Sequence, residues 1–214
     1  MKKFINNLKE LKKHNIVAIK QSLEDEGASF EEIKIMRKIT KKAGLQHNIK
    51  VGGCEAKTDI FFCEKVGVSG IVAPMVETSY GLRKFIQILT NNKRQNLYIN
   101  IESINAFNNI SKILKSKDFK KLTGLVIGRS DLAGSLNLEK SEVDSKRIFK
   151  LVKNLLKKIK KNKKILTKMG GSLTPNSVDF VSKLFKNNLL DRVETRNIEI
   201  KLSNKVLKNF REII

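Results

Sequence analysis

The sequence predicts an α/β fold, a TIM-type (β/α) barrel formed by one domain over residues 1–214. Short apolar runs without polar alternation recur along the chain, and such runs are typical of strands covered on both faces. An amphipathic helix pattern follows most of them, usually after a polar or glycine-rich loop, as in a barrel of parallel strands. Neither GxGxxG nor GxxxxGK[ST] is present, which disfavours an open nucleotide-binding sheet.

The first half of the chain contains a helix pattern followed by four strand–loop–helix units. Phe4, Leu8 and Leu11 fall at helical spacing and predict a helix over residues 3–13. Ser29, with Glu32 three residues later, has the pattern of a capping box at the start of the helix after the first strand. The predicted strands of this half are residues 16–19, 49–51, 70–73 and 97–101.

The second half contains three more units and an additional apolar stretch. Its predicted strands are residues 125–127, 165–169 and 192–196, and a long lysine-rich helix is expected over residues 145–161. A last apolar stretch, residues 198–202, precedes a short closing helix. This gives about seven βα units where a standard barrel has eight. Either an eighth strand is unrecognised or the barrel is incomplete.

The composition is strongly basic, with 44 Lys and Arg against 21 Asp and Glu and a net charge of +23. Such an excess points either to a polyanion partner or to solvated helix faces. We favour solvated faces, and expect no nucleic-acid partner, because no aromatic residues interleave with the lysine runs. Two cysteines and an N-terminus without a long apolar stretch predict a cytoplasmic protein with no membrane association.

Charged residues follow nearly every predicted strand. Because the carboxyl ends of barrel strands share one mouth, these side chains are expected to converge there. Glu102 and Asp131 end consecutive strands, and two such carboxylates, completed by waters, suit Mg²⁺ or Mn²⁺. The alternative is that each carboxylate caps the following helix or pairs with Arg129. The charged residues expected at the mouth are Lys20, Glu24, Glu26, Glu55, Glu77, Glu102, Arg129, Asp131, Lys168, Glu194 and Arg196.

Three segments in order, residues 67–77, 100–102 and 124–136, resemble the HpcH/HpaI aldolase and citrate lyase β-subunit family. The resemblance extends over roughly residues 16–200, and it implies a TIM-type barrel that binds a divalent metal through Glu102 and Asp131. It also implies a homo-oligomer. In such an enzyme the metal stabilises the enolate of a 2-oxo acid such as pyruvate while a carbon–carbon bond forms or breaks.

The function expected from this resemblance is a metal-dependent carbon–carbon lyase or aldolase. Its substrate would be a 2-oxo acid or a related small anionic compound, which includes sugar-derived ones. The alternative is a catalytically altered barrel that serves as a binding or assembly subunit.

The sequence departs from the family pattern at several strand ends. The aldolase branch has a histidine base after an early strand, where this chain has residues 24–27, and an arginine after the next strand, where it has residues 51–55. Glu26 and Glu55 are therefore the candidate general bases.

The usual Gly-Pro-x-Asp-Leu loop reads Gly128-Arg129-Ser130-Asp131-Leu132. Within this loop, Gly128 is a substrate-binding candidate and Arg129 a candidate catalytic residue and clamp for a substrate carboxylate. The alternative for Arg129 is an ion pair with a neighbouring glutamate. Lys20 and Lys168 are candidates for binding a phosphate or carboxylate, or for balancing the acidic cluster.

Overall fold

A computed structural model describes residues 2–90, 95–162 and 164–214. Over these residues, eight strands follow one another around a closed barrel in chain order. The first seven pair in parallel, and the eighth is antiparallel to both of its neighbours. The strands are β1 Ile16–Ser22, β2 Gln46–Lys50, β3 Gly70–Ala73, β4 Asn96–Ile101, β5 Gly124–Gly128, β6 Leu166–Gly170, β7 Arg192–Glu194 and β8 Ile198–Lys201.

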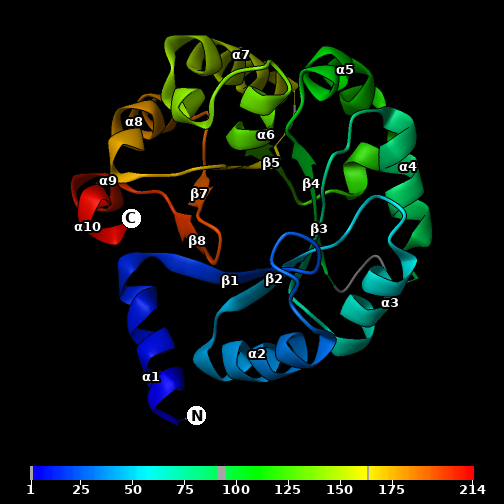
Figure 1. The fold of residues 1–214 in the computed structure, drawn as a ribbon, viewed down its shortest axis with the longest axis vertical. Coiled ribbons are helices and arrows are strands. Elements are labelled where there is room, and N and C mark those ends of the chain that lie inside the picture. Colours follow the sequence, from blue (N-terminus) through cyan, green and yellow to red (C-terminus); the bar gives the residue numbers. More distant parts are fainter. Residues whose placement is uncertain (1, 91–94, 163) are drawn as a thin grey trace.

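Helices surround this barrel on the outside, as Figure 1 shows. The first, α1, precedes β1, and its Leu8 packs in one cluster with Ile19 of β1 and Ile39 of α2. Ser29 and Glu32 form the predicted capping box at the start of α2. The helices are α1 Lys2–Leu11, α2 Phe30–Ala43, α3 Lys57–Val66, α4 Ser79–Ile88, α5 Ile104–Lys115, α6 Arg129–Gly134, α7 Lys146–Asn162, α8 Val178–Lys186, α9 Asn204–Lys208 and α10 Phe210–Ile213.

The predicted barrel is confirmed, and the apolar stretch after residue 197 is the strand missing from the count of seven. Only three residues separate β7 from β8. Two parallel strands need a crossover connection of a dozen or more residues. A three-residue connection therefore requires an antiparallel hairpin. The backbone of β8 pairs with β7 on one side and with β1 on the other, which closes the barrel. The barrel is therefore complete.

The segment after β5 also differs from the expectation. The sequence predicts a loop between Gly128 and a helix at about residue 145, but α6 begins directly at Arg129. A short 3₁₀ helix, Lys140–Asp144, then leads into α7. Asp131 therefore lies in the first turn of a helix, where a carboxylate is favoured by the helix dipole.

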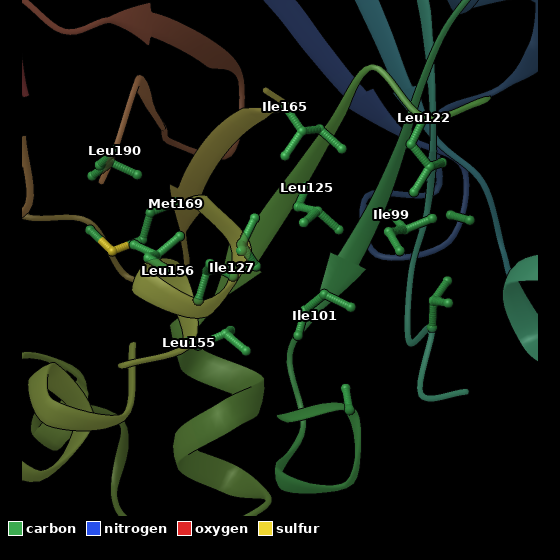
Figure 2. Packing of buried hydrophobic residues seen from close by; sticks show 14 of the residues in the cluster. Ile99, Ile101, Leu122, Leu125, Ile127, Leu155, Leu156, Ile165, Met169 and Leu190 are labelled. Carbon is green, nitrogen blue, oxygen red and sulfur yellow. The ribbon is translucent and has the colours of Figure 1, made fainter. Parts of the chain in front are cut away.

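The apolar core lies between the strands and the surrounding helices. Figure 2 shows part of it, with Ile127 of β5 and Met169 of β6 beside Leu156 of α7. All three side chains are fully buried. No helix in the described part of the chain is long and apolar enough to cross a membrane.

The interior of the barrel, by contrast, is charged. Lys168 of β6 donates a hydrogen bond to Glu199 Oε2 of β8 at 2.6 Å, and both side chains are 0% exposed. Arg192 of β7 donates to the other oxygen, Oε1, at 2.6 Å, and Asn48 of β2 donates to Oε2 at 2.9 Å. The Lys168 ammonium also lies 3.3 Å from the centre of the Tyr98 ring. Glu199 is thus the anion shared by two cations inside the barrel.

Burial and pairing act in opposite directions on these groups. Burial lowers the pKa of Lys168, an effect that the neighbouring Glu199 charge opposes. Burial by itself would raise the pKa of Glu199, but Lys168 and Arg192 hold it below its ordinary value. Because a buried charge without a partner is costly, each member of the cluster depends on the others.

We expect Glu199→Gln to lower the free energy of unfolding by about 3–5 kcal/mol, because it leaves Lys168 and Arg192 without a counter-charge in the barrel. Lys168→Met should cost less, since Glu199 keeps Arg192 and Asn48. Urea unfolding followed by circular dichroism measures both changes. The matched control is Lys34→Met, which breaks the exposed pair with Glu31 on α2 and should change stability by less than about 1 kcal/mol. Equal effects of Glu199→Gln and Lys34→Met would contradict this account of the barrel interior.

Candidate functional site

A cavity of about 630 Å³ opens at the carboxyl ends of the strands. Its lining takes residues from the ends of six of the strands or from directly after them: Ser22, Lys50, Glu102, Gly128, Gly170 and Glu194. The strand ends therefore converge on one mouth, as in other barrels of this type. Of the residues singled out in the sequence, those that line it are Lys20, Glu26, Glu102, Gly128, Asp131, Glu194 and Arg196.

Glu102 follows β4 directly and is the most constrained carboxylate of the cavity. Its side chain is held on both oxygens: the Met75 backbone N–H donates to Oε1 and Asn100 Nδ2 donates to Oε2, each at 2.9 Å. Met75 has a φ of 51°, a left-handed conformation that is uncommon for a residue with a side chain. The backbone after β3 thus adopts an unusual conformation at the residue whose N–H contacts Glu102.

Two glycines make room for the acidic side chains at the floor of the cavity. Gly128 of β5 pairs in register with Gly170 of β6. A Cβ at Gly128 would lie 2.7 Å from Glu102 Cβ, and a Cβ at Gly170 would lie 3.0 Å from Glu194 Cγ. The absence of side chains at this glycine pair therefore allows Glu102 and Glu194 to lie over two adjacent strands.

The surroundings of Glu102 change its acidity. Burial raises the pKa of Glu102 to about 6, although the Met75 N–H opposes that shift. The Asp131 charge raises this pKa further, and the Lys50 charge lowers it. Asp131 and Lys50 are therefore close enough to Glu102 to interact with it electrostatically, and all three line the cavity.

The carboxylates that line the cavity do not gather into one cluster of ligands; they are Asp25, Glu26, Glu102, Asp131 and Glu194. In the described part of the chain, no group of three or more His, Cys, Asp and Glu side chains is arranged to hold a metal ion. An all-protein site such as that of a structural zinc is thus not formed by these residues.

Lys20 and Glu26 both line the cavity but have different surroundings. Lys20 Nζ donates to Glu194 Oε1 at 2.5 Å and to the Thr195 carbonyl at 3.3 Å. Glu26 Oε2 accepts the Ser22 backbone N–H at 3.3 Å, and Glu26 Oε1 lies 3.9 Å from Arg196 Nε. These contacts connect β1 and its loop to the β7–β8 hairpin.

Arg129 does not face the cavity. Its side chain is 0% exposed and forms an ion pair with Asp144. It also donates to the carbonyls of Gly170 and Gly171, and its guanidinium lies 5.0 Å from the centre of the Phe180 ring. Arg129 thus connects the start of α6 to the loop after β6, and it is not placed to clamp a substrate. The expected alternative, an ion pair, is what forms, with an aspartate as its partner.

Two other candidates also lie outside the cavity lining. Lys168 is enclosed in the barrel interior beside Glu199, so its charge balances an acid and is not available to an anion in the mouth. Glu55 is exposed and pairs with Lys84 of α4 at 2.7 Å. Neither residue is therefore a component of the site.

Other residues of the lining were missed by sequence reasoning. Lys50 and Asn100 point inward from strands whose neighbouring residues are apolar, and the alternation of side chains along a strand is the signal that would have found them. Ser130 lies in α6 and Ser172 in the loop after β6, and their hydroxyls are 2.9 Å apart only because the fold brings these two segments together. The remaining polar residues of the lining that were missed are Gln21, Ser22, Asp25, Lys140 and Thr195.

We expect Glu102 in the metal-free protein to titrate with a midpoint near pH 6, since burial raises its pKa from an ordinary 4.5. Between these two values the folded state holds more protons than the unfolded state, so the contribution of Glu102 to stability falls as pH rises from 4.5 to 6. Carbon-13 NMR of glutamate-labelled protein measures the midpoint, and Glu102→Gln assigns the resonance. A midpoint at or below 4.5 would contradict the described burial.

Comparison with known proteins places this geometry in a family. A profile of the HpcH/HpaI aldolase/citrate lyase family matches residues 49–167, which is more than half of the chain. No curated protein sequence matches significantly.

Solved structures of the same fold match nearly the whole chain. An HpcH/HpaI aldolase from Desulfitobacterium hafniense DCB-2 has a TM-score of 0.72 at 11% identity, over 97% of this chain and 85% of that one. An HpcH/HpaI aldolase/citrate lyase family protein from Burkholderia cenocepacia J2315 has a TM-score of 0.73 at 12% identity, over 97% and 87%. The citrate synthase SbnG has a TM-score of 0.72 at 13% identity, over 97% and 86%. With the profile match, the strand-end cavity and the closed barrel in agreement, the chain belongs to the HpcH/HpaI aldolase/citrate lyase family.

Proposed function

We propose that this aldolase/citrate lyase-type enzyme uses Mg²⁺ or Mn²⁺, held by Glu102 and Asp131, to make or break a carbon–carbon bond next to the carbonyl of a 2-oxo acid. The observation that carries the proposal is that both carboxylates line one cavity and that the charge of Asp131 raises the pKa of Glu102. Two carboxylates that repel each other in a partly buried site are stabilised by a shared cation.

The residues present fit such a cation. Mg²⁺ is commonly bound by one or two carboxylates, with waters and substrate oxygens completing its octahedron. Glu102 is oriented by Met75 and Asn100, so its carboxylate is ordered before any ligand arrives. A bound dication would supply electrostatic stabilisation for the negative charge that develops on the carbonyl oxygen of the substrate.

Lys50 is suited to bind the carboxylate of the 2-oxo acid. It comes from the end of β2, lines the cavity and acts electrostatically on Glu102. Its partner in the structure is Asp25, which is 55% exposed and can be exchanged for another anion with little cost. A lysine offers a point charge where an arginine would offer a two-pronged donor, so Lys50 would hold a carboxylate less rigidly.

Glu26 is the group that we assign to proton removal from the carbon next to the carbonyl. It lines the cavity, whereas both histidines lie elsewhere: His14 ends the 3₁₀ turn before β1, and His47 is buried in β2 beside Gln21. Burial lowers the pKa of His47 to about 4, so its ring is neutral at pH 7. A cavity carboxylate therefore replaces the histidine of the related aldolases.

With a dication bound, the lining would suit a small, polar, anionic substrate, because the dication and four cationic side chains then outweigh the five carboxylates of the lining. Its cations are Lys20, Lys50, Lys140 and Arg196, and its hydroxyls are those of Ser22, Ser130, Ser172 and Thr195. Hydroxyl groups of this kind serve as hydrogen-bond partners for a hydroxylated or sugar-derived chain.

We expect wild-type protein to exchange the methyl protons of pyruvate with D₂O only when Mn²⁺ or Mg²⁺ is present. Glu102→Gln and Asp131→Asn should each lower the exchange rate at least about 100-fold, because each removes a charge that holds the cation. Proton NMR measures the exchange. Glu31→Gln, on the outer face of α2, is the matched control and should be indistinguishable from wild type.

Two outcomes would argue against this function. Exchange that persists with a chelator in both variants would remove the metal from the reaction. No exchange and no Mn²⁺ binding by calorimetry in the wild type would favour the alternative of a barrel that acts as a binding or assembly subunit.

We also expect Gly128→Ala to weaken Mn²⁺ binding by about 10–100-fold, since the new methyl group would displace Glu102, whose Cβ lies 2.7 Å away from it. Gly134→Ala is a matched control in the adjacent helix α6, where a Cβ would meet nothing within 4 Å. Electron paramagnetic resonance of free Mn²⁺ gives the affinity of each variant. Equal affinities of the two variants would show that Glu102 does not hold the ion.

A further inference from the structure

We propose that Lys20, oriented by Glu194, donates the proton to the second substrate carbonyl, the one whose oxygen becomes a hydroxyl when the new carbon–carbon bond forms. This inference rests on the proposed function. It names the residue that would protonate the second carbonyl oxygen, a step in which Glu102 and Asp131 take no part.

The contacts of Lys20 leave it one hydrogen to give. An ammonium group carries three N–H donors. Two of them reach Glu194 Oε1 at 2.5 Å and the Thr195 carbonyl at 3.3 Å. Lys20 lines the cavity, and its side chain is 15% exposed. The third N–H is therefore available to an oxygen of a bound molecule.

The floor of the cavity places Glu194, the partner of Lys20, over the strand next to the one over which Glu102 lies. A Cβ at Gly128 would lie 3.3 Å from the Glu102 carboxyl carbon, and a Cβ at Gly170 would lie 3.4 Å from the Glu194 oxygen that holds Lys20. These two glycines pair in register on neighbouring strands, and neighbouring strands are about 4.8 Å apart. Lys20 and Glu102 can therefore act on neighbouring groups of bound substrate, such as the two carbonyl groups that the new carbon–carbon bond brings together.

The other cations of the site are less suited to this step. Lys50 acts on Glu102 and is assigned to the substrate carboxylate. Lys140 is exposed on the rim, and the Arg196 side chain is 75% exposed. An arginine is also a poor proton donor because its guanidinium stays protonated in proteins. With Lys50 assigned to the carboxylate, Lys20, whose side chain is 15% exposed, is the enclosed cation that remains for this step.

The step balances with the groups on hand. The enolate carbon attacks the aldehyde carbon, a carbon–carbon bond forms, and the carbonyl π electrons move to the aldehyde oxygen. That oxygen takes a proton from Lys20 as the N–H bond breaks and the O–H bond forms. In the cleavage direction, the Lys20 amine removes the hydroxyl proton and the electrons return to the enolate. Solvent restores the proton on Lys20 between turnovers.

Glu194 is a positioning residue in this account. It is 6% exposed and comes from β7, directly before the hairpin that closes the barrel. Its Oε1 accepts a hydrogen bond from Lys20 Nζ, while its Oε2 has no hydrogen-bond partner among the described residues. The carboxylate therefore holds the ammonium at one point of the floor.

The test separates the two halves of the reaction. Proton exchange into pyruvate with Mn²⁺ needs no second carbonyl, whereas addition of pyruvate to glycolaldehyde, glyceraldehyde or succinic semialdehyde does. In Lys20→Met we expect addition to fall at least about 100-fold, and exchange, Mn²⁺ binding and oxalate binding to fall far less than addition. Lys20→Gln, which keeps a hydrogen bond to Glu194, should show the same split and guards against a folding defect. Lys34→Met on α2 is the matched control.

The rates of exchange and addition distinguish the role of Lys20 from the proposed function. Equal losses of exchange and addition in both Lys20 variants would overturn the inference and give Lys20 a structural role. Wild-type exchange without addition to any of the three aldehydes would also overturn it. Absence of exchange in wild type would instead count against the proposed function itself.

Glu194→Gln tests the positioning role by a different readout. A neutral amide keeps the hydrogen bond but removes the paired charge, so we expect the pH profile of addition to shift while that of exchange stays unchanged. Glu194→Asp, which restores the charge, should recover part of the addition rate. If both profiles move together, Glu194 acts on the whole cavity and not through Lys20.

Discussion

The closure of the barrel by β8 is the constraint on which the rest of the structure depends. This short strand brings Glu199 into the barrel, where it neutralises Lys168 and Arg192 at 2.6 Å each. Without that carboxylate, the fully buried Lys168 and the mostly buried Arg192 would lose their shared counter-charge, which is strongly unfavourable. The same hairpin contributes Glu194 to the cavity. Glu194 follows Arg192 by two residues on β7. The charged interior and the site therefore share one structural element.

Much of the fold could be predicted from the sequence because its local signals agree. Apolar runs such as residues 97–101 and 125–127 are strands, and the Ser29–Glu32 capping box starts a helix where expected. The last strand was harder to recognise because its inward residue Glu199 is charged and lies between Ile198 and Ile200. Buried charges are rare, so this alternation of apolar and charged residues is more typical of a strand with one exposed face. Its antiparallel direction was not predicted, and the structure explains it by the three-residue connection between β7 and β8.

The site could be predicted only in part, since a strand end indicates which residues approach the mouth but not where a long side chain turns. Glu102 and Asp131 reach the cavity as expected, whereas Arg129, two residues from Asp131, turns back to Asp144 and the loop after β6. In this position the guanidinium is satisfied by Asp144, by two backbone carbonyls and by the ring of Phe180 in α8, partners that the sequence does not place beside it. Lys168 also turns away from the mouth, because its charge is satisfied by Glu199 inside the barrel.

The hairpin connection has a consequence for the order in which the protein can fold. Strands β1 to β6 add successive neighbours as the chain is synthesised, but β1 finds its second partner only when β8 arrives. Until that moment the sheet has two open edges, and Lys168 lacks the carboxylate that satisfies it. Open strand edges can pair with other chains and lead to aggregation. The second edge pairing of β1 and the internal ion cluster both require β8, so the two cannot form before the end of the chain is available.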